Sequence, residues 1–114
     1  MEFGIKERLI LNASLQGVKG NVAQLRILRK LREELSFSEE EFKKFELRQE
    51  GGNFIWSRTK EESKEIEIGD EARKIIIERL KQLSAQGQLL DDHLDVIDKF
   101  PEVEEAKDAQ RPNS

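Results

Sequence analysis

Residues 36–45 read SFSEEEFKKF, and they mark the point where the chain changes from a helical pattern to an extended one. The Ser38 hydroxyl can accept a hydrogen bond from the backbone N–H of Glu41, and the Glu41 carboxylate can accept one from the backbone N–H of Ser38. This reciprocal arrangement is a capping box. Phe37 and Phe42 have the spacing of a hydrophobic staple across the same helix start. The stretch therefore predicts a short, well-capped helix.

Beyond this helix the residues alternate between apolar and polar, as in strands. Two short runs flank Gly51-Gly52, and a pair of glycines between two such runs predicts a β-hairpin. The stretch KEIEI, residues 64–68, alternates again and predicts a third strand. Three strands are about the least that gives a small sheet stability of its own. We therefore expect one small three-stranded antiparallel sheet.

Two helices are predicted before the capping box, over residues 5–15 and 21–35. The second has the clearer signal, because Asn21 can cap it and its apolar residues recur at steps of three and four. We expect the resulting stripe to face the core. The stripe comprises Val22, Leu25, Ile27, Leu28, Leu31 and Leu35.

Two more helices are predicted after the strands. Asp70 can cap the first of them, and Gly87 follows its last apolar residue, where a C-terminal cap is expected. The second covers residues 91–100 and ends at Pro101, which cannot continue a helix. Its apolar residues, Leu94 among them, are expected to face inward.

Blocks of helix and strand in this order predict an α+β fold. Residues 1–101 would form a single domain in which helices flank the sheet. Residues 102–114 lack periodicity, and we expect them to form a disordered acidic and polar tail. Three helices followed by a hairpin also fit a winged helix-turn-helix, so this variant of the fold stays open.

The composition narrows the class of protein. The chain has 114 residues, the size of one domain, and it has no cysteine, which excludes disulfides and thiolate chemistry. The N-terminus lacks the pattern of a signal peptide, and the apolar runs are too short to span a bilayer. We therefore expect a cytoplasmic location. Apolar residues make up only 36% of the chain, which favours additional burial between copies in a homo-oligomer.

No catalytic, cofactor-binding or metal-binding motif is recognisable. His93 is the only histidine, and with the nearby aspartates it offers too few suitable ligands for zinc. The glutamates at 39–41 are explained by the helix cap and the helix dipole rather than by acid–base chemistry. The glycines match no nucleotide-binding fingerprint. The sequence therefore predicts a non-enzymatic protein that needs no cofactor.

The strongest candidate for a binding surface is the polar face of the second helix, which is basic. Such a face can contact the phosphates of DNA, contact a protein, or simply be solvated. The overall negative charge and the three glutamates of the capped helix argue against DNA. The basic residues of this helix are Arg26, Arg29, Lys30 and Arg32, and Lys6, Arg8 and Lys19 could add to them.

Charge is divided between the two ends of the chain. Residues 1–35 hold seven Lys or Arg against four Asp or Glu, whereas residues 86–114 hold three against eight. Opposite charges at the two ends can favour head-to-tail or crossed contacts between copies. Trp56 is a separate candidate: this single tryptophan either anchors the sheet on the helices or forms an exposed interface contact.

Four segments resemble a group of small phage and prophage proteins that has no assigned activity. The segments are LRKLREELSFSEEE (28–41), EGGNFIW (50–56), EIGDEARKIII (67–77) and DDHLDVIDKF (91–100). The resemblance implies an accessory role for a mobile genetic element, in the cytoplasm of a bacterial host. Together with the residues above, it predicts a non-enzymatic protein that acts by protein–protein interaction and can do so as a homo-oligomer. The alternative is a winged-helix-like regulator that binds DNA.

Overall fold

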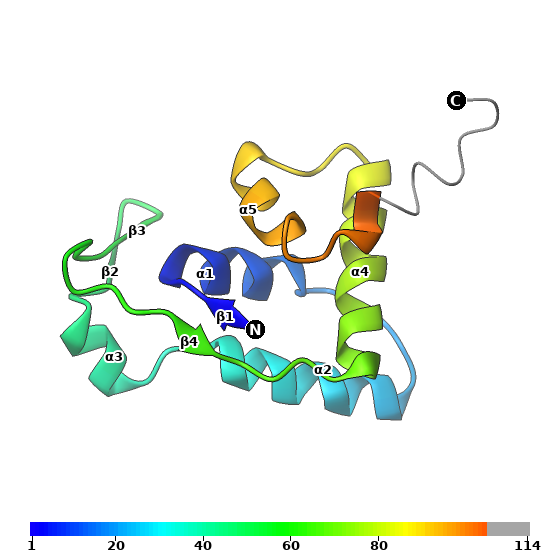
Figure 1. Ribbon diagram of the computed structural model, residues 1–114, viewed down its shortest axis with the longest axis horizontal. Coiled ribbons are helices and arrows are strands. Elements are labelled where there is room, and N and C mark those ends of the chain that lie inside the picture. Colours follow the sequence, from blue (N-terminus) through cyan, green and yellow to red (C-terminus); the bar gives the residue numbers. More distant parts are fainter. Residues whose placement is uncertain (105–114) are drawn as a thin grey trace.

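The computed structural model describes residues 1–104, and it has an α+β architecture, which confirms the predicted fold class (Figure 1). The described elements are β1 (Glu2–Phe3), α1 (Ile5–Ser14), α2 (Val22–Leu35), α3 (Glu39–Lys44), β2 (Arg48–Glu50), β3 (Asn53–Ile55), β4 (Lys64–Glu65), α4 (Asp70–Ala85), the 3-10 turn η1 (Asp91–His93) and α5 (Leu94–Ile97).

Helix α1 is the centre of the molecule. It packs against α2 on one side and against η1 and α5 on the other, while α4 packs across α2 and closes one end (Figure 1). The main core lies between these helices, and β1 and the residue after β4 add to it. Its fully buried side chains include Phe3, Leu11, Leu35, Ile66, Ile76, Leu80, Val96 and Phe100.

The helix starts form as the sequence predicts. The backbone N–H of Glu41 donates to the Ser38 hydroxyl at 3.2 Å, and the backbone N–H of Ser38 donates to the Glu41 carboxylate at 3.0 Å. The ring centroids of Phe37 and Phe42 lie 6.0 Å apart, which confirms the staple. Asn21 caps α2, as predicted. Asp70 does not cap α4: Gly69 is the N-cap, and Asp70 is the first helical residue, where its carboxylate still suits the helix dipole.

The hairpin is confirmed, but the predicted three-stranded sheet is wrong. Strands β2 and β3 pair with each other across Gly51-Gly52, whereas β4 pairs with β1, a strand that the sequence analysis missed. Burial explains this choice. Pairing β1 with β4 brings Phe3 and Ile66 into the main core, whereas every residue of the hairpin strands is exposed. Nothing in the described part of the fold supports the winged-helix variant, because the hairpin lacks a third strand and α3 has only six residues.

The apolar stripe of α2 faces the core only in its second half. Leu28, Leu31 and Leu35 are buried, whereas Val22 is 67% exposed and Leu25 is 42% exposed. The cause is the spacing, because each step of three residues falls about 60° short of a full helical turn. Two such steps separate Leu28 from Val22, which therefore points about 120° away from the buried side.

The C-terminal segment differs from its prediction in two ways. The helix expected over 91–100 is divided into η1 and α5, and Leu94 is exposed rather than buried. Residues 102–104 do not begin a tail, because they are helical and Val103 is buried in the main core. The rest of the predicted tail, residues 105–114, lies outside the described residues.

Candidate interaction surface

The predicted basic residues of α2 lie on its side away from the core, but they spread over two flanks. Arg29 and Arg32 line a groove toward α1, and Lys30 lines a cavity toward α4. Arg26, Arg29 and Lys30 are exposed, and none of them forms an ion pair within residues 1–104. The ion pairs of the described chain instead engage Lys6, Arg8, Lys44, Arg48, Lys60, Arg73, Lys74 and Lys99. The positive charge on α2 is therefore available to a binding partner.

Arg32 belongs to the same face, but its side chain already makes one hydrogen bond within the chain. Its Nε–H donates to the Asn12 side-chain oxygen on α1 at 2.8 Å, which fixes the guanidinium group beside the groove between the two helices. Glu33 and Glu34 follow directly, so the positive charge of α2 is confined to its middle part, between residues 26 and 32. We call the residues Val22, Leu25, Arg26, Arg29, Lys30 and Arg32 the α2 face.

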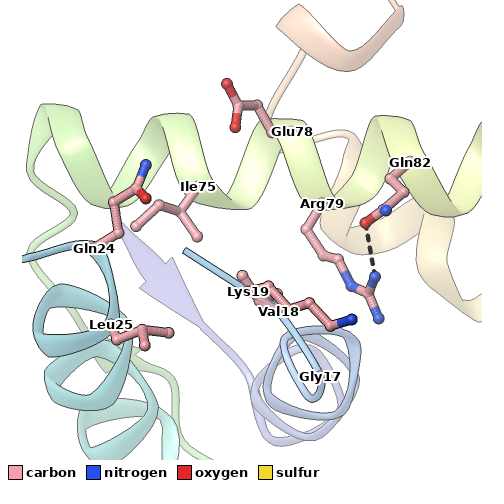
Figure 2. Close-up of a pocket in the computed structure, with 9 residues that line it drawn as sticks. All are labelled: Gly17, Val18, Lys19, Gln24, Leu25, Ile75, Glu78, Arg79 and Gln82. Atoms are coloured by element: carbon pink, nitrogen blue, oxygen red, sulfur yellow. Dashed lines mark hydrogen bonds between the residues drawn. The ribbon is translucent and has the colours of Figure 1, made fainter. Parts of the chain in front are cut away.

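A cavity of about 410 Å³ adjoins the α2 face where α2, α4 and the loop after α1 meet (Figure 2). Leu25 and Ile75 line it from the two helices, and Val18 lines it from the loop. Arg79 forms one end: its guanidinium donates to the backbone oxygens of Ser14 at 2.8 Å and Gln16 at 3.0 Å. These bonds cap the free carbonyl groups at the end of α1, so Arg79 has a structural role.

A second cavity, of about 390 Å³, lies along the groove between α1 and α2. Leu25 lines this cavity as well as the first, so its side chain lies between them. Arg29 and Arg32 line the second cavity together with Leu28. The α2 face thus combines hollows, aliphatic side chains and cations. The sequence analysis identified the cations but did not predict that Val22 and Leu25 are exposed. The three-residue steps between Val22, Leu25 and Leu28 could have indicated this exposure.

Arg8 and Lys6 do not join the α2 face. Arg8 is fully buried, and its guanidinium donates to the Glu41 carboxylate at 2.6 and 3.2 Å and to the backbone oxygens of Leu35 and Ser36. The Arg8 guanidinium lowers the pKa of Glu41 to about 2. Lys6 lies on the other side of α1, where its ammonium group is 2.9 Å from the Asp92 carboxylate. Arg8 is therefore wrong as a phosphate contact, and Lys6 lies apart from the α2 face. Lys19 is exposed and lines the first cavity.

Trp56 is half-buried at the edge of the smaller core. It packs on the cluster formed by Ile5, Phe45 and Leu47, and its indole N–H donates to Glu61 at 2.6 Å. This position fits an anchor better than an exposed hot spot. The exposed aromatic side chain of the hairpin is Phe54, which the sequence analysis did not single out.

Two of the residues considered for chemistry serve structural roles. Glu41 pairs with Arg8, and His93 accepts a hydrogen bond at Nδ1 from the backbone N–H of Leu90 at 2.9 Å. Within residues 1–104, no three His, Cys, Asp or Glu side chains are grouped so that they could hold a metal ion. Among the helices of the same residues, none is long and apolar enough to cross a membrane.

Comparison of the chain with protein-family models, with curated proteins and with solved structures finds no match. The resemblance to phage and prophage proteins is therefore neither supported nor contradicted, and it stays a prediction. Function has to be argued from the surface itself.

Proposed function

We propose that this chain is a non-enzymatic protein that acts through protein–protein contact, and that the α2 face is its contact surface. One observation carries the proposal. Arg26, Arg29 and Lys30 have no ion pair in the described structure, and they lie beside the exposed aliphatic side chains of Val22 and Leu25. Elsewhere the described cations are mostly paired with carboxylates. The α2 face is thus basic and apolar at the same time.

This mixture fits an acidic protein surface better than it fits DNA. Arginine is enriched at protein interfaces, and aliphatic side chains gain free energy there when a partner covers them. Phosphate contacts need cations and polar donors and leave apolar side chains unused. The helix that would read bases in a winged helix, α3, begins with Glu39, Glu40 and Glu41, which would repel phosphates.

The accessory role for a phage or prophage is part of the proposal and rests on the four resembling segments. One of these segments, residues 28–41, contributes Arg29, Lys30 and Arg32 to the α2 face. An accessory protein that works by contact needs no catalytic group, which agrees with the structural roles of Glu41 and His93.

Site-specific photo-crosslinking tests the contact surface. A benzophenone amino acid replaces Val22 in the full chain, which is produced in bacterial cells and irradiated. We expect a covalent protein adduct from position 22. The adduct should be lost when Arg26 and Arg29 are both changed to Gln, because the charge that holds the partner is then missing. The same amino acid in place of Phe54, which is 42% exposed on the hairpin, provides the control.

Adducts from position 54 but none from position 22 would overturn the choice of surface. A titration of labelled duplex DNA, followed by fluorescence anisotropy, tests the alternative regulator. Binding that weakens steeply with salt and disappears in the Arg26→Gln/Arg29→Gln variant would indicate phosphate contacts on the α2 face. That result, without a protein adduct at position 22, would replace the proposed protein contact by nucleic-acid binding.

A further inference from the structure

A second exposed surface has the same construction as the α2 face with the opposite charge. Leu90 is 70% exposed and Leu94 is 48% exposed, so two large aliphatic side chains lie uncovered at η1 and α5. Exposed carboxylates surround them. We call this surface the α5 patch, and it comprises Leu90, Asp91, Leu94, Asp95 and Asp98.

Part of the charge on the α5 patch is neutralised from within the molecule. The Lys6 ammonium group lies 3.5 Å from the Asp95 carboxylate and 2.9 Å from that of Asp92. Asp91 and Asp98 form no ion pair with any described residue. The α5 patch therefore has two carboxylates without an ion pair beside exposed leucines. The α2 face has two guanidinium groups without an ion pair, those of Arg26 and Arg29, beside Val22 and Leu25.

The two surfaces belong to elements that pack on different sides of helix α1. Helix α1 packs between them, with α2 on one side and η1 and α5 on the other (Figure 1). One chain therefore cannot bring its own α5 patch onto its own α2 face. Two copies can do so, because the α5 patch of one copy and the α2 face of the next are complementary in charge and both apolar in part.

We propose that the α2 face binds the α5 patch of a second copy of this chain. The inference rests on the proposed function and names its partner. Contact between two α2 faces, or between two α5 patches, would place like charges opposite each other and is disfavoured. The contact is therefore heterologous: each copy uses different surfaces toward its two neighbours, and successive copies form open chains or closed rings.

Concentration and salt should both change the assembly. Each surface has only a few exposed aliphatic side chains, so we expect a small interface with a dissociation constant of about 100 µM. In sedimentation experiments the average mass should rise above the 13.3 kDa of the monomer as concentration increases. Raising the salt from about 0.05 M to about 0.5 M should weaken association about tenfold, because the contact depends on exposed charges.

Two neutralised variants and their mixture give the decisive test. Arg26→Gln/Arg29→Gln weakens the α2 face, and Asp91→Asn/Asp98→Asn weakens the α5 patch. Alone, each variant should associate about tenfold less tightly than the unaltered chain, since every junction needs one surface of each kind. In an equimolar mixture the intact α5 patch of the first can bind the intact α2 face of the second. The mixture should therefore form one-to-one dimers that do not grow.

The controls separate loss of contact from loss of fold. Arg26→Lys/Arg29→Lys keeps the charge and should retain most of the association. Lys43→Gln/Arg58→Gln removes the same charge at exposed positions outside both surfaces and should associate like the unaltered chain. All substituted side chains are exposed, so the thermal midpoints should agree.

An unaltered chain that stays monomeric at every concentration would overturn the inference, and so would variants that assemble normally or fail to combine when mixed. The proposed function is judged separately. Suppose that the chain is monomeric and that the adduct at position 22 contains a different protein. This result would support protein contact by the α2 face and reject the second copy as its partner.

Discussion

Arg8 is the residue on which several local structures depend. Its guanidinium carries a charge in a fully buried position, and it donates four hydrogen bonds, to the Glu41 carboxylate and to the backbone oxygens of Leu35 and Ser36. The guanidinium carbon also lies 3.9 Å from the centre of the Phe37 ring. Glu41 in turn completes the capping box of α3. A single cation thus joins α1, the end of α2 and the start of α3.

Replacing Arg8 and replacing Glu41 should lower the free energy of unfolding by different amounts. Glu41→Ala leaves a buried guanidinium without its anion, and we expect it to lower the free energy of unfolding by about 3 to 5 kcal/mol. Arg8→Met leaves only a carboxylate that water can reach, so about 1 to 3 kcal/mol is expected. Urea unfolding at neutral pH measures both, with Glu40→Ala, an exposed neighbour in the same turn, as the control. Equal costs would contradict the argument.

The same pair predicts a dependence of stability on pH. The folded-state pKa of Glu41, about 2, lies below its ordinary value of 4.5, because Arg8 stabilises the carboxylate. The stabilisation is therefore complete above pH 4.5 and is lost as the pH falls toward 2. The thermal midpoint of Glu41→Gln should drop less between about pH 5 and about pH 2 than that of the unaltered chain. Identical drops would show that other carboxylates cause the effect.

At the scale of the elements, local signals were sufficient to predict the helices α1 to α4, the caps at Asn21 and Ser38, and the hairpin, but not the cap of α4 or the division of the last predicted helix. Ser38 and Glu41 lie three residues apart, and Gly51-Gly52 form their turn without help from distant residues. The partner of β4 could not be predicted in this way. β1 has two residues, too few for a periodic pattern, and its pairing is decided by the burial of Phe3 and Ile66 more than sixty residues apart.

The two halves of α2 should respond differently to substitution. Leu28→Ala removes a buried side chain and should cost about 2 to 4 kcal/mol of unfolding free energy. Val22→Ser should cost no more than about 0.5 kcal/mol, because Val22 is already exposed in the folded chain. Chemical unfolding of the two variants at low protein concentration checks this. A large cost at Val22 would show that the N-terminal half of α2 is covered.

At the scale of the whole molecule, the candidate surface was only half predictable. The cations of α2 were evident from their spacing, but their availability depends on which carboxylates lie nearby in three dimensions. Lys6 and Arg8 look equally available in the sequence, and the fold commits both of them to carboxylates. The α5 patch could not be found, because Leu94 follows the same periodic pattern as the buried Ile97 and Phe100.

The end of the domain also depends on the whole fold. The Arg73 guanidinium donates two hydrogen bonds to the Glu102 carboxylate, at 2.6 and 2.7 Å, and Val103 is buried nearby in the main core. A chain that ends after Pro101 should therefore be less stable, by about 2 kcal/mol, than a chain that ends after Glu104. The thermal midpoints of the two shortened chains should differ by about 10 °C. Equal midpoints would restore the boundary at residue 101.

The Arg8–Glu41 ion pair has a kinetic consequence. Its partners are separated by 33 positions along the chain, whereas the capping box that presents Glu41 is made by neighbours. A guanidinium that left water before its carboxylate arrived would raise the energy of the folding chain. We therefore expect the local box to form early and the ion pair to close late, after the barrier to folding has been crossed. The ion pair should then slow unfolding and leave the rate of folding nearly unchanged.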